Sequence, residues 1–84
     1  MKQFNLEEYI RLKAEGREPK LCTRYGHNVR MLCIDRKNVA QGTPFPIVAL
    51  IELENTEHAT YYTASGNYYE KGGSRFDLFF ADQY

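Results

Sequence analysis

The sequence predicts an α+β domain with an N-terminal helix followed by a twisted antiparallel β-meander, or partly open small barrel, of five to six strands. Two observations predict it. A capped amphipathic segment lies near the amino terminus, and beyond Pro19 short apolar runs alternate with turn residues. We expect one domain over residues 1–84, with the helix over about 6–15 and the meander over about 20–80.

The predicted helix has a start signal and a stop signal. Asn5 is a favourable N-cap residue, and Glu8 three residues later gives the pattern of a capping box. Phe4 and Tyr9 flank the cap at the spacing of a hydrophobic staple. Gly16 suits the position just after the last turn, because glycine adopts the left-handed conformation without a steric penalty.

The strands follow as short runs between turn residues. The run Ile47–Leu53 is apolar on both faces, which predicts a central strand covered on both sides. Before it lie a turn at Gly26-His27, a polar connection over Arg36–Thr43 and the segment Pro44-Phe45-Pro46. The expected strands are Lys20–Tyr25, Asn28–Asp35, Ile47–Leu53, Ala59–Ala64, Asn67–Glu70 and Arg75–Phe80.

Two expected turns assign faces in the C-terminal half. A two-residue loop at Ser65-Gly66 places Tyr62 opposite Tyr69, and a four-residue loop at Lys71–Ser74 places Tyr69 opposite Phe76. Alternation along the strands then separates an apolar face from a mixed face. The apolar face, expected to be core, carries Tyr62, Tyr69, Phe76, Leu78 and Phe80. The mixed face carries Tyr61, Thr63, Tyr68, Glu70, Arg75, Asp77 and Phe79.

The charges balance overall but are unevenly placed. Residues 1–40 hold nine of the eleven Lys and Arg but only five of the eleven acids, whereas residues 41–84 hold two bases and six acids. A neutral chain is not an obvious polyanion binder, since that role usually needs an overall basic domain. We expect the two halves to fold against one another, so that their fields largely cancel.

The residues that chemistry would need do not form a recognisable constellation. Both serines, Ser65 and Ser74, fall in predicted turns, away from any base. Cys22 and Cys33 fall within strands and are expected as buried, reduced thiols. With His27 they give a spacing without a C-x-x-C pair, which argues against zinc. We therefore expect no enzymatic activity, no metal, no cofactor and no small-molecule substrate.

The longest apolar run, Ile47–Ile51, is far shorter than the roughly 20 residues of a membrane-spanning helix. The first residues lead directly into a charged segment, without the apolar stretch of a secretion signal. With only two cysteines, a cytoplasmic protein that does not contact membranes is expected.

Two binding hypotheses remain, and both use the mixed face. The first is a protein-interaction or self-association module, because Tyr, Phe and Arg are enriched at interfaces. The alternative is a nucleic-acid-binding module in which aromatic rings stack on bases and Arg24, Arg30, Arg36 and Lys37 meet phosphates. Whether the helix covers this face is left open by the sequence. The candidate binding residues are Tyr61, Tyr68 and Phe79, flanked by Arg75, with Arg24 and Arg30 as the basic alternative.

Several segments together resemble a family of short, uncharacterised bacterial and phage proteins. That family has a T-R-D-G-x-x-V-R-I-x-C-T-D hairpin, a P-I-V-A-L-I strand, a Y-T-x-x-G-x-Y hairpin and a terminal D-L-F. The matching segments are Thr23-Arg24-Tyr25-Gly26, Val29-Arg30-Met31, Cys33-Ile34-Asp35, Pro46–Ile51, Tyr62–Tyr68 and Asp77-Leu78-Phe79. Tyr25 departs from the family, which has Asp before the glycine. The resemblance implies a small β-rich domain in a bacterial or phage setting, and it implies no activity.

Overall fold

The structure is a computed structural model that describes residues 2–37 and 45–81. The α+β class is confirmed, but a short strand precedes the helix, so the helix is not the first element. Of the polar connection predicted over Arg36–Thr43, only Arg36 and Lys37 are among the described residues. Pro44 of the segment that follows also lies outside the described residues. The elements in order are β1 (Lys2–Gln3), α1 (Leu6–Ala14), β2 (Leu21–Thr23), β3 (Asn28–Cys33), β4 (Ile47–Leu53), β5 (Thr56–Tyr62) and β6 (Leu78–Phe80).

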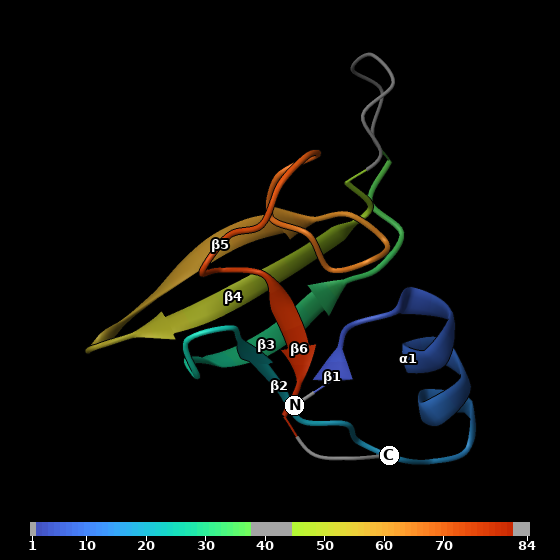
Figure 1. The fold of residues 1–84 in the computed structure, drawn as a ribbon. Helices are drawn as coiled ribbons and strands as arrows, with labels where there is room; N and C mark the ends of the chain where they lie inside the picture. Colours follow the sequence, from blue (N-terminus) through green and yellow to red (C-terminus); the bar gives the residue numbers. More distant parts are fainter. Residues whose placement is uncertain (1, 38–44, 82–84) are drawn as a thin grey trace.

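The strands form one antiparallel sheet in the order β1-β6-β2-β3-β4-β5. Strands β2 to β5 make the predicted meander. The chain then returns across the sheet, and β6 pairs with both β1 and β2 instead of continuing the meander. Figure 1 shows the strongly twisted sheet curling into a half-barrel, with α1 beside the β1–β6 end and the β4–β5 hairpin extending away from it.

The ends of α1 confirm the predicted N-cap, hydrophobic staple and C-terminal glycine, whereas the Glu8 carboxylate of the predicted capping box bonds to Lys2. The Asn5 side-chain oxygen accepts a hydrogen bond from the Glu8 backbone N–H at 3.0 Å, and the Phe4 and Tyr9 rings lie 5.6 Å apart. At the other end Gly16 has a φ of +82°, so the chain turns into the left-handed region. The Arg17 N–H then bonds to the Leu12 carbonyl, closing a Schellman motif.

The core lies between the concave face of the sheet and one face of α1. Strand β4 contributes Ile47, Ala49 and Ile51 to the buried side, whereas Val48 and Leu50 on its other face are only half-buried. The prediction that both faces of this strand are covered was wrong, because α1 packs on the concave face alone. The core cluster is Phe4, Tyr9, Leu12, Leu21, Ile47, Ala49, Tyr62, Leu78 and Phe80.

Two segments of the chain form the same turn. In Thr23–His27 and again in Thr63–Asn67, the first threonine exchanges backbone hydrogen bonds with the residues three and four positions later. The threonine Oγ1 also accepts the N–H of the fifth residue, at 3.0 Å in both turns. Gly26 and Gly66 supply the positive φ that such three-residue loops require. The predicted two-residue loops at Gly26-His27 and Ser65-Gly66 were therefore wrong.

The second turn does not lead into a hairpin. Residues 67–70 form no strand, and Leu78 is the first residue of β6, so the strands predicted over Asn67–Glu70 and from Arg75 onward were wrong in whole or in part. The predicted pairs of Tyr69 with Tyr62 and of Tyr69 with Phe76 do not form among the described residues, because Tyr69 is not in a strand and Tyr62 lies opposite Ile47. The segment instead folds around the side chain of Asp77, which accepts the Tyr68 and Ser74 N–H groups that a strand ladder would otherwise use.

The predicted faces are consequently only partly correct. Tyr62, Leu78 and Phe80 are buried as expected, but Phe76 is half-buried and Tyr69 is 54% exposed. On the mixed face, Asp77 is 1% exposed and Tyr68 packs against the core, whereas Tyr61 stays 51% exposed. The residues predicted to share the mixed face therefore do not form one surface: Asp77 is buried, whereas Tyr61 is exposed to solvent.

Candidate functional site

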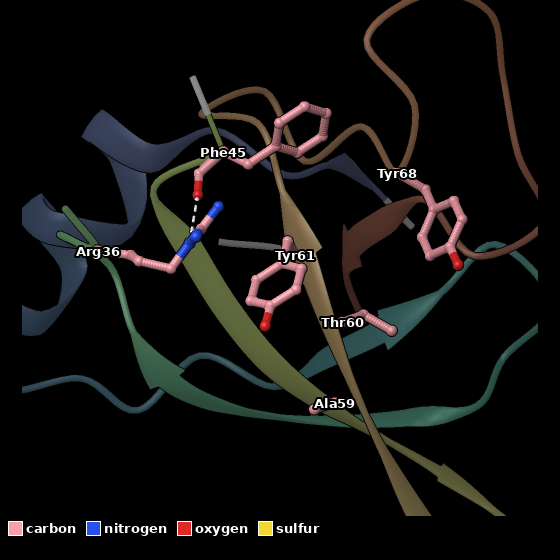
Figure 2. A pocket seen from close by; sticks show the side chains of 6 residues that line it. All are labelled: Arg36, Phe45, Ala59, Thr60, Tyr61 and Tyr68. Carbon is pink, nitrogen blue, oxygen red and sulfur yellow. Dashed lines mark hydrogen bonds between the residues drawn. The ribbon is translucent and has the colours of Figure 1, made fainter. Parts of the chain in front are cut away.

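The exposed Tyr61 and the half-buried Arg36 form a stacked pair on the convex side of the sheet. Tyr61 lies opposite Val48 in the β4–β5 register, and the Arg36 guanidinium carbon lies 4.4 Å from the centre of the Tyr61 ring. Arg36 Nε donates a hydrogen bond to the Phe45 carbonyl at 3.1 Å, which holds the guanidinium in place (Figure 2). A cation over a tyrosine face contributes about 0.5–1 kcal/mol at an exposed site, so the pair is ordered before any partner arrives.

These two residues border a shallow hollow of about 440 Å³. Arg36 is the charged member of its lining, and the other members present mainly carbon atoms and two tyrosine hydroxyls. A surface of this kind suits an apolar or aromatic side chain accompanied by a carboxylate. We call it the β5 platform, and its residues are Arg36, Phe45, Ala59, Thr60, Tyr61 and Tyr68 (Figure 2).

Tyr68 connects the β5 platform to the concave side of the sheet. Its ring meets the buried Tyr62 edge-on with the centroids 6.3 Å apart, and it lies 5.4 Å from the Phe76 ring. With Phe76 it lines a second hollow of about 180 Å³, which shares Ala59, Thr60 and Tyr68 with the first. Strand β5 therefore contributes to the lining of both hollows.

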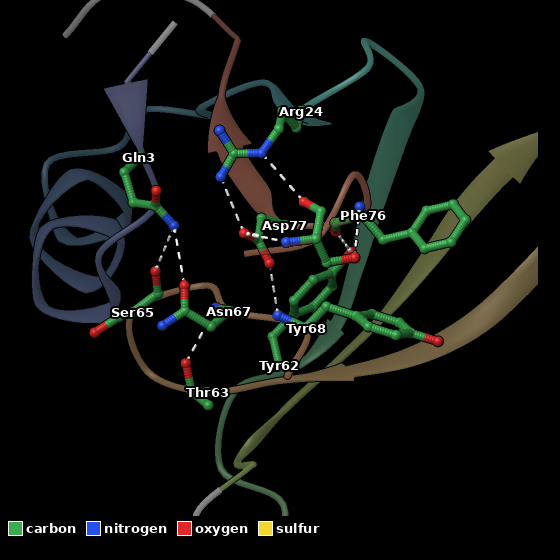
Figure 3. A network of polar contacts seen from close by, with 10 residues as sticks. Gln3, Arg24, Tyr62, Thr63, Ser65, Asn67, Tyr68, Phe76 and Asp77 are labelled. Atoms are coloured by element: carbon green, nitrogen blue, oxygen red, sulfur yellow. Dashed lines mark hydrogen bonds and ion pairs between the residues drawn. The ribbon is translucent and has the colours of Figure 1, made fainter. Parts of the chain in front are cut away.

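The predicted basic residue Arg24 belongs to a structural network. Its Nη2 lies 3.0 Å from Asp77 Oδ2, and its Nε donates to the Ser74 carbonyl at 3.1 Å. The guanidinium also lies 4.9 Å from the centre of the Phe79 ring. Arg24 and Phe79 thus contact each other and do not line the β5 platform. The two bonds of Arg24 hold the 63–77 segment against the end of β2 (Figure 3).

Asp77 is engaged in three structural hydrogen bonds. Its Oδ1 accepts the Tyr68 N–H at 2.9 Å, and its Oδ2 accepts the Ser74 N–H at 3.0 Å in addition to the Arg24 guanidinium. These three donors fix the carboxylate in place, and the loop is organised around it (Figure 3).

The remaining basic candidates are also engaged. Arg30 makes a two-pronged contact with Glu57, at 2.9 and 3.2 Å, across the convex face. This hydrogen bonding lowers the pKa of the Glu57 carboxyl and raises the pKa of Arg30. The Arg75 guanidinium lies 5.0 Å from the centre of the Phe76 ring. The ion pairs of Arg24 and Arg30 join the basic half of the chain to the acidic half, as predicted from the charge distribution.

Of the predicted binding residues, only Tyr61 and Tyr68 belong to the β5 platform. Sequence reasoning considered Arg36 only as a phosphate contact, and it did not select Phe45 at all. A signal for both was available, because Arg36 follows β3 and Phe45 precedes β4, and β4 is the strand that pairs with the strand carrying Tyr61. The Arg36 backbone N–H bonds to the Pro46 carbonyl at 2.8 Å, which brings the two segments together.

Metal ligands do not converge in the part of the chain that the structure describes, where no three His, Cys, Asp or Glu side chains lie close enough to share an ion. Cys22 is a buried thiol outside any disulfide, as predicted, whereas Cys33 is only half-buried and its Sγ donates to Asp35 Oδ1 at 3.2 Å. No helix among residues 2–37 and 45–81 has the length and apolarity to cross a membrane.

No protein family and no solved structure matches the chain. Over 55 residues, 66% of its length, the sequence is 36% identical to the neuraminidase of influenza A virus (strain A/Equine/Prague/1/1956 H7N7). The chain spans about 11% of the length of that neuraminidase. A match to so small a part of the viral protein is a local similarity, and it assigns neither a family nor an activity to this chain.

Proposed function

We propose that this chain is a non-enzymatic protein-interaction module that binds its partner on the β5 platform. The observation that carries the proposal is the exposed Tyr61 ring with Arg36 stacked on it, beside an open hollow. Tyrosine and arginine are enriched among the residues that dominate binding energy at protein interfaces. The helix packs on the opposite side of the sheet, so it leaves this surface available.

The chemistry of the β5 platform favours a particular ligand. The apolar lining would bury an aromatic or branched side chain, and Arg36 would meet a carboxylate next to it. Strand β5 would supply backbone groups to an extended peptide, a common mode of recognition at sheet edges. We therefore propose an extended peptide segment with alternating apolar and acidic residues as the partner.

Selection from a random peptide library displayed on phage tests this proposal. Wild-type protein should enrich peptides with the alternating pattern, and Tyr61→Ala should bind the enriched peptides at least about tenfold more weakly, since a central aromatic anchor contributes over 1 kcal/mol. The matched control is Tyr25→Ala, which removes a 70% exposed tyrosine on the β2–β3 turn. Enrichment that is insensitive to Tyr61, or sensitive to both tyrosines equally, would contradict the proposal.

Nucleic-acid binding is the alternative that the Tyr61–Arg36 stack also supports, because a base could replace the guanidinium on the ring. It is the weaker proposal, since Arg24 and Arg30 already pair with carboxylates and leave fewer cations for phosphates. Anisotropy of labelled single- and double-stranded oligonucleotides at low and physiological salt separates the two. Salt-sensitive binding that Tyr61→Ala abolishes would favour this alternative.

A further inference from the structure

Strand β5 lies at one edge of the sheet. Among the described residues, β4 is the only strand that pairs with it, along all seven residues from Thr56 to Tyr62. An edge of this length presents a row of backbone donors and acceptors to any strand that approaches. Residues of β5 line both hollows, so the space beside this strand can take side chains of an added strand, which alternate between the two faces.

The charges along this edge are of opposite sign at its two ends. Glu52, Glu54 and Glu57 lie at the β4–β5 turn, where Glu52 and Glu57 face each other directly in the register. Like charges that face each other destabilise a strand pair. Arg30 offsets part of this repulsion, because it is bonded to Glu57. At the other end of β5, Arg36 stacks on Tyr61, and Lys37 follows it with an exposed side chain.

A second copy of the chain complements this arrangement when it runs antiparallel. The middle residue of β5 is Ala59, so pairing β5 with β5 about a two-fold axis at Ala59 engages the whole strand. In that register Glu57 of one copy lies opposite Tyr61 of the other, the residue on which Arg36 stacks. The acidic end of each edge thus meets the basic end of the other, and the small exposed Ala59 side chains meet at the axis.

We propose that two copies of this chain associate edge to edge through β5, antiparallel and centred on Ala59, to form one continuous sheet. This proposal rests on the proposed function, since it names a second copy as the partner of the β5 platform. A symmetric contact of this kind is closed and stops at a dimer. A contact limited to one strand edge is small, so the dimer should dissociate on dilution.

Sedimentation velocity over a wide concentration range tests the proposal with charge variants at the axis. Ala59→Lys and Ala59→Glu each place two like charges opposite one another across the dimer, and each should raise the dissociation constant at least about fivefold. An equimolar mixture of the two variants should restore association to the wild-type level or beyond. The matched controls are Ala14→Lys and Ala14→Glu, at an exposed residue of α1, and they should leave the dimer unchanged. Urea unfolding confirms that all four variants are folded.

The outcomes distinguish this proposal from the proposed function. A wild-type chain that stays monomeric throughout the range overturns the dimer, and so does a dimer whose affinity neither Ala59 variant changes. If the monomer nevertheless binds selected peptides in a Tyr61-dependent way, the proposed function stands and only the second copy is refuted. Absence of both the dimer and the peptides refutes both. Weakening by each variant with rescue in the mixture supports the register itself.

Discussion

The two matching turns allow a steric effect to be separated from a backbone effect. Gly26 and Gly66 occupy the same place in the turn, with φ of +91° and +80°. A methyl group added at Gly26 would meet nothing within 4 Å. One added at Gly66 would lie 2.7 Å from Phe4 Cβ and 3.1 Å from the Leu78 carbonyl oxygen. The second turn is thus pressed against the segment that leads into α1, and the first is not.

The two substitutions to alanine should therefore differ in cost. Holding alanine in the left-handed region costs roughly 1–2 kcal/mol at either position. At Gly66 the clash adds about 1–3 kcal/mol, because Phe4 Cβ and the backbone of β6 cannot move without disturbing the core. We expect Gly26→Ala to lower the free energy of unfolding by about 1 kcal/mol and Gly66→Ala by about 3 kcal/mol.

Urea unfolding, monitored by circular dichroism, measures the free energy of unfolding of both variants by linear extrapolation to zero urea. The effect of alanine on the unfolded chain is the same for both variants, so it cancels in the comparison. Losses that agree within about 0.5 kcal/mol would refute the packing of the second turn against Phe4. A larger loss at Gly26 than at Gly66 would refute it more strongly.

Three further predictions concern named interactions. Asp77→Asn should destabilise the fold by about 2–4 kcal/mol in urea, since it weakens the bond to Arg24 and turns one acceptor of a buried group into a donor. Burial raises the pKa of Tyr62 to about 12, so the folded state keeps a proton that the unfolded state loses near pH 10. Stability should thus fall by roughly 2–3 kcal/mol between pH 10 and 12, and Tyr62→Phe should reduce that fall. Arg30→Ala should leave urea stability nearly unchanged, because its pair with Glu57 is exposed; a large loss would contradict this account.

The elements that sequence reasoning predicted well carry their signals within a few residues. The helix has Asn5 at its start and Gly16 at its end, and both act through hydrogen bonds to neighbouring residues. Strand β4 has the predicted bounds, Ile47–Leu53, because a run of branched and apolar residues between turn residues fits few other structures.

The 63–77 segment was predicted poorly because its structure depends on partners far away in the chain. Asp77 bonds to Arg24, and β6 pairs with β1 and β2, so no local pattern specifies either interaction. The repeated T-x-x-G segments at Thr23 and Thr63 were visible in the sequence, however. Reading them as one turn type would have replaced the wrong two-residue loops.

The candidate site was predicted in part for the same reason. Tyr61 was found because it alternates with the buried Tyr62 along β5, a pattern of period two. Phe79 was grouped with it because continuous hairpins were assumed, whereas β6 lies towards the other end of the sheet. Arg24 was proposed separately, as a basic strand residue that could meet a phosphate. Arg36 reaches Tyr61 only through the pairing of Arg36 with Pro46, which spans the β3–β4 connection.

Amide chemical-shift mapping with a selected peptide tests most directly the claim that the β5 platform is the interaction surface. Titration of the isotope-labelled protein should shift the amide signals of Ala59 to Tyr62 and the Arg36 side-chain signal, with little change in α1. Shifts concentrated on α1, or around Arg24 and Phe79 at the other end of the sheet, would contradict the account.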